Sequence, residues 1–164
     1  MGWAEALLLR FFLSVPGRHR LNAFFPRLTE RRAGRRGACL KHVIDIGQLQ
    51  IMTSGDAALA AEALGIFRQS AELWSRLLDP HAEPDHWADA AHGIKGAARA
   101  VGLMPLGDAC EIAETLGRTG TASAVEAGVA LSAVKDRLGE ALEAIAHVEH
   151  QLMMKRSFDG VRLD

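Results

Sequence analysis

Apolar residues recur at intervals of three and four along most of the chain, which is the spacing of one face of an α-helix. This pattern predicts long helices over residues 57–78, 85–101 and 122–153. It predicts a further helix around residues 106–116 and a short one over residues 46–52. No pair of strands and no internal repeat is indicated, so the sequence predicts an all-α protein.

Three of these helices carry apolar stripes that we expect to face a common core. On the helix over residues 85–101 the stripe is Trp87, Ala91, Ile94, Ala98 and Val101. On the helix over residues 57–78 it is Leu59, Ala63, Ile66, Phe67, Ser70, Leu73, Trp74 and Leu77. On the last helix it is Val125, Val129, Leu131, Val134, Leu138, Leu142, Ile145, Val148 and Leu152.

Glycine and proline mark the ends of the helices. The pair Asp79-Pro80 ends the helix over residues 57–78. Gly102 follows the helix over residues 85–101, at the position where many helices end with a glycine in the left-handed conformation. Pro105 suits the first turn of the next helix, and residues 117–120 predict a turn. Short connections make neighbouring helices antiparallel. The expected fold is therefore an antiparallel four-helix bundle with a short additional N-terminal helix.

The distribution of charge divides the chain into parts of different character. Residues 1–42 are rich in arginine and are interrupted by prolines and glycines, so we expect a basic, poorly ordered leader there. Residues 43–153 are predicted to form the helical-bundle domain, and residues 154–164 a frayed tail. The arginine run at residues 31–36 has no interleaved aromatic residues and no recognisable binding fold, so nucleic acid is not an expected partner.

Composition argues against several other classes of protein. The two cysteines, Cys39 and Cys110, are too few for a disulfide scaffold and lack the spacing of metal ligands, so we expect a reducing, cytoplasmic setting. The apolar run at residues 6–15 is about half the length that a membrane-spanning helix needs, and Arg10 interrupts it. No membrane span is expected. The sequence also lacks a Walker-type phosphate loop, so it gives no support for kinase activity.

One predicted helix breaks a local rule, because Gly93 and Gly96 both lie in its interior, where each costs roughly 1 kcal/mol relative to alanine. His92 is rotated about 100° away from the apolar stripe. Lys95 and Gly96 follow one turn later on the same side, and Arg99 a turn beyond them. An exposed imidazole beside a cation and a bare stretch of backbone suits phosphoryl transfer, which depends on positioning and charge stabilisation.

The run from Ala91 to Gly96, followed by Gly102, resembles the signature of histidine-containing phosphotransfer (HPt) domains. That signature has a histidine, a lysine three residues later, a glycine four residues later and another glycine ten residues later. The resemblance covers roughly residues 43–153 and includes Leu106, Cys110 and Glu114. It implies a helical bundle that relays phosphoryl groups between the aspartates of receiver domains in two-component signalling.

By this resemblance His92 is the phosphorylated residue and Lys95 stabilises the phosphoryl group, with Arg99 as a further candidate for that role. Ala88, Gly93 and Gly96 would form the face on which a receiver domain docks. Many family members carry a small polar residue near the position of Arg99. The arginine would either strengthen contacts with the phosphoryl group or restrict which receiver docks.

The resemblance also implies that the domain is a phosphoryl carrier without ATP-dependent kinase activity and needs no cofactor of its own. The receiver partner, including the receiver of a hybrid sensor kinase, would supply Mg²⁺. A monomer is expected from the charged outer faces of the bundle. No metal site is expected, because His81, His86 and His92 share no common face and His147 and His150 are only two ligands.

One alternative is a bundle that docks receivers or another signalling partner without being phosphorylated. The exposure of His92 separates the two hypotheses, because a carrier needs an accessible imidazole. Asp89 lies one turn before His92 and would either orient the ring or remain a solvated acid.

Overall fold

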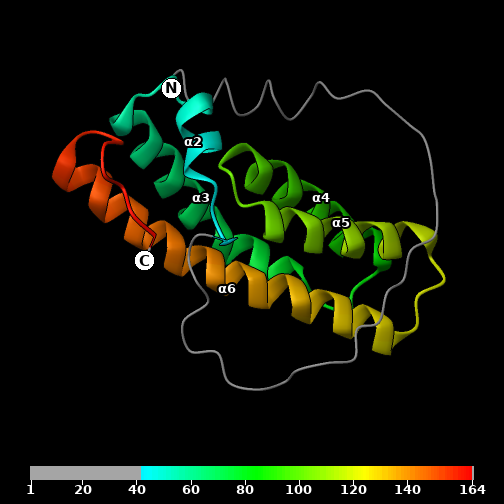
Figure 1. Cartoon of the computed structure of the whole chain (residues 1–164). Coiled ribbons are helices and arrows are strands. Elements are labelled where there is room, and N and C mark those ends of the chain that lie inside the picture. Colours follow the sequence, from blue (N-terminus) through cyan, green and yellow to red (C-terminus); the bar gives the residue numbers. More distant parts are fainter. Residues whose placement is uncertain (1–41, 164) are drawn as a thin grey trace, which may run out of the picture. The chain divides into compact units, whose positions relative to one another are not determined.

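A computed structural model describes residues 42–163, which form five helices and no strand. The helices are α2 (Ile46–Met52), α3 (Ala57–Leu77), α4 (Pro84–Ala100), α5 (Met104–Thr119) and α6 (Ala124–Lys155), as Figure 1 shows. The last four form the predicted antiparallel bundle, and α2 is the predicted short additional helix. The leader predicted over residues 1–42 lies outside the described residues except for His42.

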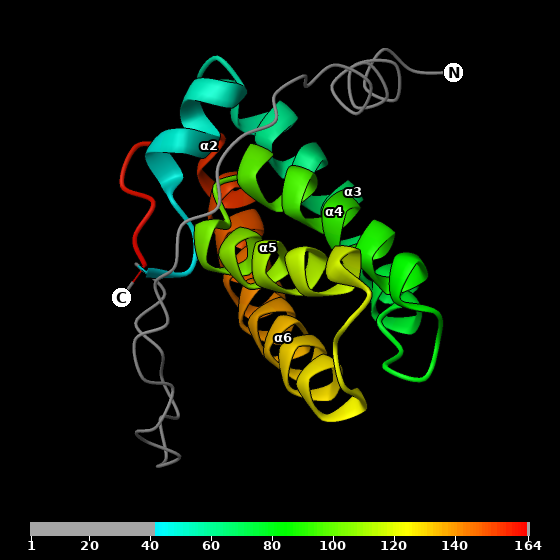
Figure 2. The same cartoon turned by 90° about the vertical axis from the view of Figure 1, so that its right-hand side faces the viewer.

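The bundle is held together by three main helix pairs. The most extensive contacts join α4 to α5, while α6 packs against both α3 and α5 (Figures 1 and 2). The predicted stripe of α4 is confirmed, since its five members are all buried in the core between the helices. Within residues 42–163 no helix combines the length and apolar character needed to cross a membrane.

Side chains at the helix starts satisfy main-chain N–H groups that have no partner within the helix. Asp56 accepts hydrogen bonds from the main-chain N–H groups of Ala58 and Leu59 at the start of α3. Ser123 and Glu126 form a reciprocal capping box at the start of α6. These contacts explain why the two helices begin where they do.

Gly102 fixes the short connection between α4 and α5. Its φ of 83° lies in the left-handed region, which glycine adopts without strain. Its carbonyl oxygen also accepts a hydrogen bond of 2.8 Å from the main-chain N–H of Asp45. A Cβ at this position would lie 2.5 Å from the carbonyl oxygen of Asp45, so only glycine permits this contact before α2.

The helix α5 continues through the turn predicted at residues 117–120. Gly117 lies within α5 and is buried, and the left-handed residue that ends the helix is Gly120. A Cβ on Gly117 would lie 2.7 Å from the Cβ of Ala88 and 2.7 Å from the ring of Trp87. Gly117 is therefore a close-packing residue between α4 and α5, and the predicted turn begins three residues later than expected.

The predicted stripe of α3 is wrong in part, since Phe67 is buried and Trp74 packs against the core as expected, but other members do not. Leu59, Leu73 and Leu77 are exposed, whereas the buried residues are Ala57, Ala60, Leu64, Phe67 and Ala71. Three of the five buried residues are alanines, which apolar periodicity distinguishes poorly from the residues around them. On α6 the predicted members Val125 and Val129 are likewise exposed, while the stripe from Leu131 onward is buried apart from the partly buried Leu142.

Residues 156–163 fold back along α6, so the frayed tail predicted over residues 154–164 is wrong for its described part. The side-chain amide of Gln151 pairs with both main-chain groups of Arg162, accepting from its N–H at 2.9 Å and donating to its carbonyl oxygen at 2.6 Å. Three apolar side chains of this segment pack against the core: Phe158, Val161 and Leu163. They provide the burial that holds the segment in place.

The Gly117→Ala variant should lower the free energy of unfolding by about 1–3 kcal/mol, because the new methyl group would force α4 and α5 apart. The matched control is Gly139→Ala on α6, where nothing lies within 4 Å of an added Cβ. That variant should gain about 0.5–1 kcal/mol from helix propensity. Urea unfolding followed by circular dichroism measures both, and equal stability of the two variants would contradict the close packing at Gly117.

Candidate functional site

His92 projects from the outer side of α4, next to the buried stripe of that helix. Its neighbour Ala91 is fully buried, whereas the side chain of His92 is 60% exposed. The difference follows from the rotation of about 100° between successive helical residues. The imidazole is therefore accessible to a macromolecular partner, as a phosphoryl carrier requires.

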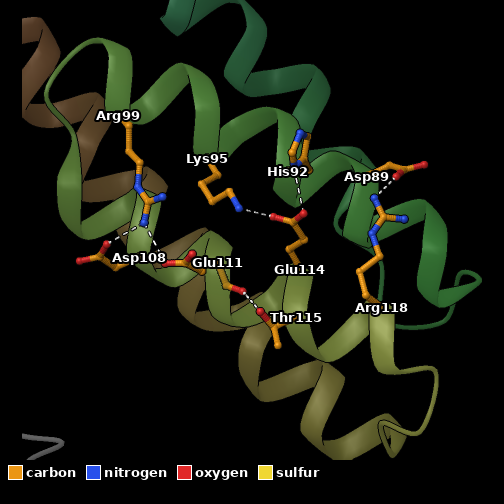
Figure 3. Close-up of polar contacts among 9 residues, drawn as sticks. All are labelled: Asp89, His92, Lys95, Arg99, Asp108, Glu111, Glu114, Thr115 and Arg118. Carbon is orange, nitrogen blue, oxygen red and sulfur yellow. Dashed lines mark hydrogen bonds and ion pairs between the residues drawn. The ribbon is translucent and has the colours of Figure 1, made fainter. Parts of the chain in front are cut away.

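Glu114 of α5 reaches across to the imidazole. Its Oε1 lies 2.8 Å from Nδ1 of His92 (Figure 3). An ionised carboxylate can only accept a hydrogen bond, so Nδ1 carries the proton in this contact. In the neutral ring the lone pair then belongs to Nε2, the nitrogen that is not engaged by Glu114.

Lys95 shares the same carboxylate. Its Nζ lies 2.6 Å from Oε2 of Glu114, and only 19% of its side chain is exposed. Oε2 is buried and has no aligned hydrogen bond within residues 42–163, so the ion pair with Lys95 balances its charge. His92, Glu114 and Lys95 thus form one connected group, in which the acid lies between the imidazole and the ammonium (Figure 3).

The environment of Glu114 favours its ionised form. Burial acts to raise the pKa of its carboxyl group, but the contacts with Lys95 and His92 lower it by more. The net result is a pKa below the ordinary value, so the carboxylate is charged at neutral pH. A charged carboxylate is what holds the proton on Nδ1 of His92.

The glycines predicted for the docking face differ in their surroundings. Gly96 is exposed, and a Cβ built there would meet nothing within 4 Å, so no internal packing requires glycine at this position. Gly93 is half-buried. Ala88 does not belong to this face, because it is fully buried opposite Gly117 of α5. The prediction of Ala88 as a docking residue is therefore wrong.

Arg99 lies away from the imidazole and is engaged elsewhere. Its Nη2 lies 2.8 Å from Oε2 of Glu111 and 3.3 Å from Oδ1 of Asp108, both on α5 (Figure 3). The hydrogen bond to Glu111 contributes most to raising its pKa. Its stem covers Gly107, where a Cβ would lie 2.9 Å from Cγ of Arg99. The structure therefore does not bring Arg99 together with His92 and Lys95.

Asp89 does not orient the imidazole either. Its carboxylate pairs with Nη2 of Arg118 on α5, and Asp85 lies 3.6 Å from Nη1 of the same guanidinium. The ring of His92 is oriented by Glu114 instead. Sequence reasoning assigned no role to Glu114 or Arg118, and spacing along one helix could not reveal partners that lie on the next helix.

Other candidate groups do not form a site. Within the described range, no three His, Cys, Asp or Glu side chains gather in a way that could hold a metal ion. Cys110 is buried as expected, and burial raises the pKa of its thiol to about 12. A thiol with so high a pKa stays protonated and is a poor nucleophile.

Replacing Glu114 with glutamine should lower the free energy of unfolding at neutral pH by about 1–3 kcal/mol, since Lys95 would lose its charged partner. The pKa of Glu114 is lower in the folded protein than its ordinary value of 4.5. Its contribution is therefore present above that value and lost as the pH falls through the folded pKa. Urea unfolding at pH 7 and at about pH 3 should show the difference between wild type and Glu114→Gln shrinking in acid. The control is Glu143→Gln, since Glu143 is exposed. An equal effect of both variants would refute the stabilising role assigned to the contact between Glu114 and Lys95.

Comparisons with known proteins show the family to which the chain belongs. The sequence matches the Hpt domain family over residues 56–148. The fold is similar to the crystal structure of the histidine phosphotransferase ShpA from Caulobacter crescentus, with 35% sequence identity and a TM-score of 0.55. The match covers 69% of this chain and 96% of that one. No curated protein matches the sequence. The chain therefore belongs to the Hpt domain family of phosphotransfer proteins in two-component signalling.

Proposed function

We propose that His92 carries a phosphoryl group on Nε2, which it takes from the aspartate of one receiver domain and passes to the aspartate of another. The observation that carries the proposal is the hydrogen bond between Nδ1 of His92 and Glu114. It leaves Nε2 with the lone pair on an imidazole that is 60% exposed. Such a ring is an accessible nucleophile that needs no further base.

In the transfer step the ring of His92 does not need to lose a proton. The lone pair of Nε2 attacks the phosphorus of the aspartyl phosphate, an N–P bond forms, and the P–O bond to the aspartate breaks. The aspartate leaves as a carboxylate. The product ring is a phosphoimidazolium that keeps its Nδ1 proton, and the carboxylate of Glu114 offsets its positive charge. The reverse step returns the phosphoryl group to a second aspartate.

Lys95 is suited to stabilising the transferred group. It lies one turn after His92 on α4, and its ammonium is already held close to the site by Glu114. Phosphoryl transfer spreads negative charge over the phosphoryl oxygens, which an ammonium can bind. We assign Mg²⁺ and the acidic pocket to the receiver partner, and we expect the carrier to act as a monomer in the cytoplasm without ATP-dependent kinase activity.

Phosphorylated receiver domains from the same organism should label the wild-type protein but not His92→Gln. His86→Gln is the matched control, since His86 is an exposed histidine of the same helix and should leave labelling intact. The label should be lost in acid and kept in alkali, as expected for a phosphorus–nitrogen bond. Radiolabel transfer on gels and phosphorus NMR measure it.

Two results would contradict the carrier role. Equal labelling of wild type and His92→Gln would place the phosphoryl group on another residue. Absence of label from every receiver tried, with a folded protein that still binds receivers, would indicate the docking-only function.

Gly96→Ala should separate the stability of the domain from its phosphotransfer activity. Because no neighbour lies within 4 Å of the added Cβ, the variant should be more stable by about 0.5–1 kcal/mol. The methyl group stands on the exposed face beside His92, so the transfer rate should fall on the order of tenfold, equivalent to about 1.4 kcal/mol. Gly139→Ala should gain stability without losing transfer, and unchanged transfer in Gly96→Ala would exclude Gly96 from the docking face.

A further inference from the structure

Two charged clusters flank His92 on the surface formed by α4 and α5 (Figure 3). In the first, Arg118 of α5 pairs with Asp85 and Asp89 of α4. In the second, Arg99 of α4 pairs with Asp108 and Glu111 of α5. We refer to them as the Arg118 cluster and the Arg99 cluster.

The clusters lie on opposite sides of the imidazole along α4. Asp89 precedes His92 by one turn, and Arg99 follows it by two turns. With a rise of 1.5 Å per residue, Asp89 and Arg99 are about 15 Å apart along the helix axis. A receiver domain that brings its aspartate to His92 would therefore cover both clusters, because a protein interface extends over roughly 800 Å² on each partner.

Each cluster has more negative than positive charge. Two carboxylates face one guanidinium in both cases, so each cluster carries one net negative charge. The carboxylates are well exposed, with 79% and 67% of the side chains of Asp85 and Asp89 accessible, and 70% and 53% of those of Asp108 and Glu111. Glu114 adds no further net charge between the clusters, because Lys95 balances it.

The contact between α4 and α5 does not require two carboxylates in each cluster. Exposed ion pairs contribute little to stability, and a single acid would already pair with each arginine. The helices are held together by buried contacts such as that of Gly117 with Trp87. The second acid in each cluster instead leaves an exposed negative charge on the face that contains His92.

We infer that the Arg118 and Arg99 clusters are docking points for a receiver domain that carries basic side chains on both sides of its phosphorylated aspartate. This inference rests on the proposed function, and it adds the surface charge by which the protein would distinguish one receiver domain from another. Complementary charges at the rim of an interface raise the association rate and disfavour partners with the wrong charge. Arg99 then acts in partner selection and not in contacts with the phosphoryl group.

The test compares two double variants with a control that changes net charge equally. Asp85→Asn with Asp89→Asn alters the Arg118 cluster, and Asp108→Asn with Glu111→Gln alters the Arg99 cluster. Asp136→Asn with Glu143→Gln on the exposed side of α6 is the control. The probe is a phosphorylated receiver domain of the same organism, and kcat and kcat/KM for transfer are measured from low to high salt. Labelling by phosphoramidate, a small donor that needs no docking, reports the reactivity of His92 itself.

Each cluster variant should lower kcat/KM on the order of tenfold at low salt relative to the control, with kcat unchanged. The difference should shrink as salt increases, because ions screen the exposed charges. Labelling by phosphoramidate should match wild type. Equal kcat/KM in the cluster variants and the control would overturn the inference, as would a loss confined to kcat or to labelling by phosphoramidate.

Failure of the proposed function gives a different result. If no receiver labels the wild type, binding of the same receiver domains is measured by titration calorimetry at the same salt concentrations. Salt-dependent binding that both cluster variants weaken would uphold the docking points without the carrier role. Absence of binding by every receiver would overturn the inference.

Discussion

The close approach of α4 and α5 is the constraint on which the functional site depends. Gly117 has no side chain, so α5 can lie directly against Trp87 and Ala88 of α4. At this separation the side chain of Glu114 reaches both His92 and Lys95. A wider spacing would leave the imidazole without its partner and the ammonium without its counter-ion. The reactivity assigned to His92 therefore rests on a packing contact that involves no polar atom.

Glu114 connects the stability of the bundle to the chemistry of its surface. One oxygen is exposed enough to meet the imidazole, while the other is buried against the ammonium of Lys95. The buried oxygen makes the position of the carboxylate rigid, because moving it would separate an ion pair in a poorly solvated place. A rigid acceptor fixes the ring and its tautomer before any partner arrives, which is the usual advantage of a preorganised site.

Features that lie on α4 alone could be predicted from the sequence. The stripe from Trp87 to Val101 contrasts clearly with the polar residues around it, and the helical repeat then places His92, Lys95 and Gly96 together beside this stripe. Features that depend on two helices could not. Assigning Glu114 to His92 requires the rotation of α5 against α4, and Ala88 was misplaced because the side on which α5 packs was unknown.

Two further errors arise where the apolar pattern of the sequence is weak. On α3 three of the five buried residues are alanines, while Leu59, Leu73 and Leu77 are exposed, so apolar periodicity predicted part of the buried face wrongly. The segment over residues 156–163 has few apolar residues, but the pairing of Gln151 with Arg162 supplies contacts that periodicity does not detect. Small side chains on the inner face of α3, and hydrogen bonds from the side chain of Gln151 to the main chain of Arg162, have no strong pattern in the sequence.

The pairing of α3 with α6 has a consequence for biosynthesis. The helices α4 and α5 are joined by a short connection, so they can pack together soon after both have left the ribosome. Part of the inner face of α3, which packs mainly against α6, stays uncovered until α6 has also been synthesised. The nascent chain can thus bring Glu114 to His92 in a local hairpin while apolar surface of α3 is still exposed. Completion of the long C-terminal helix, and not formation of the site, is then the step that completes the core of the bundle.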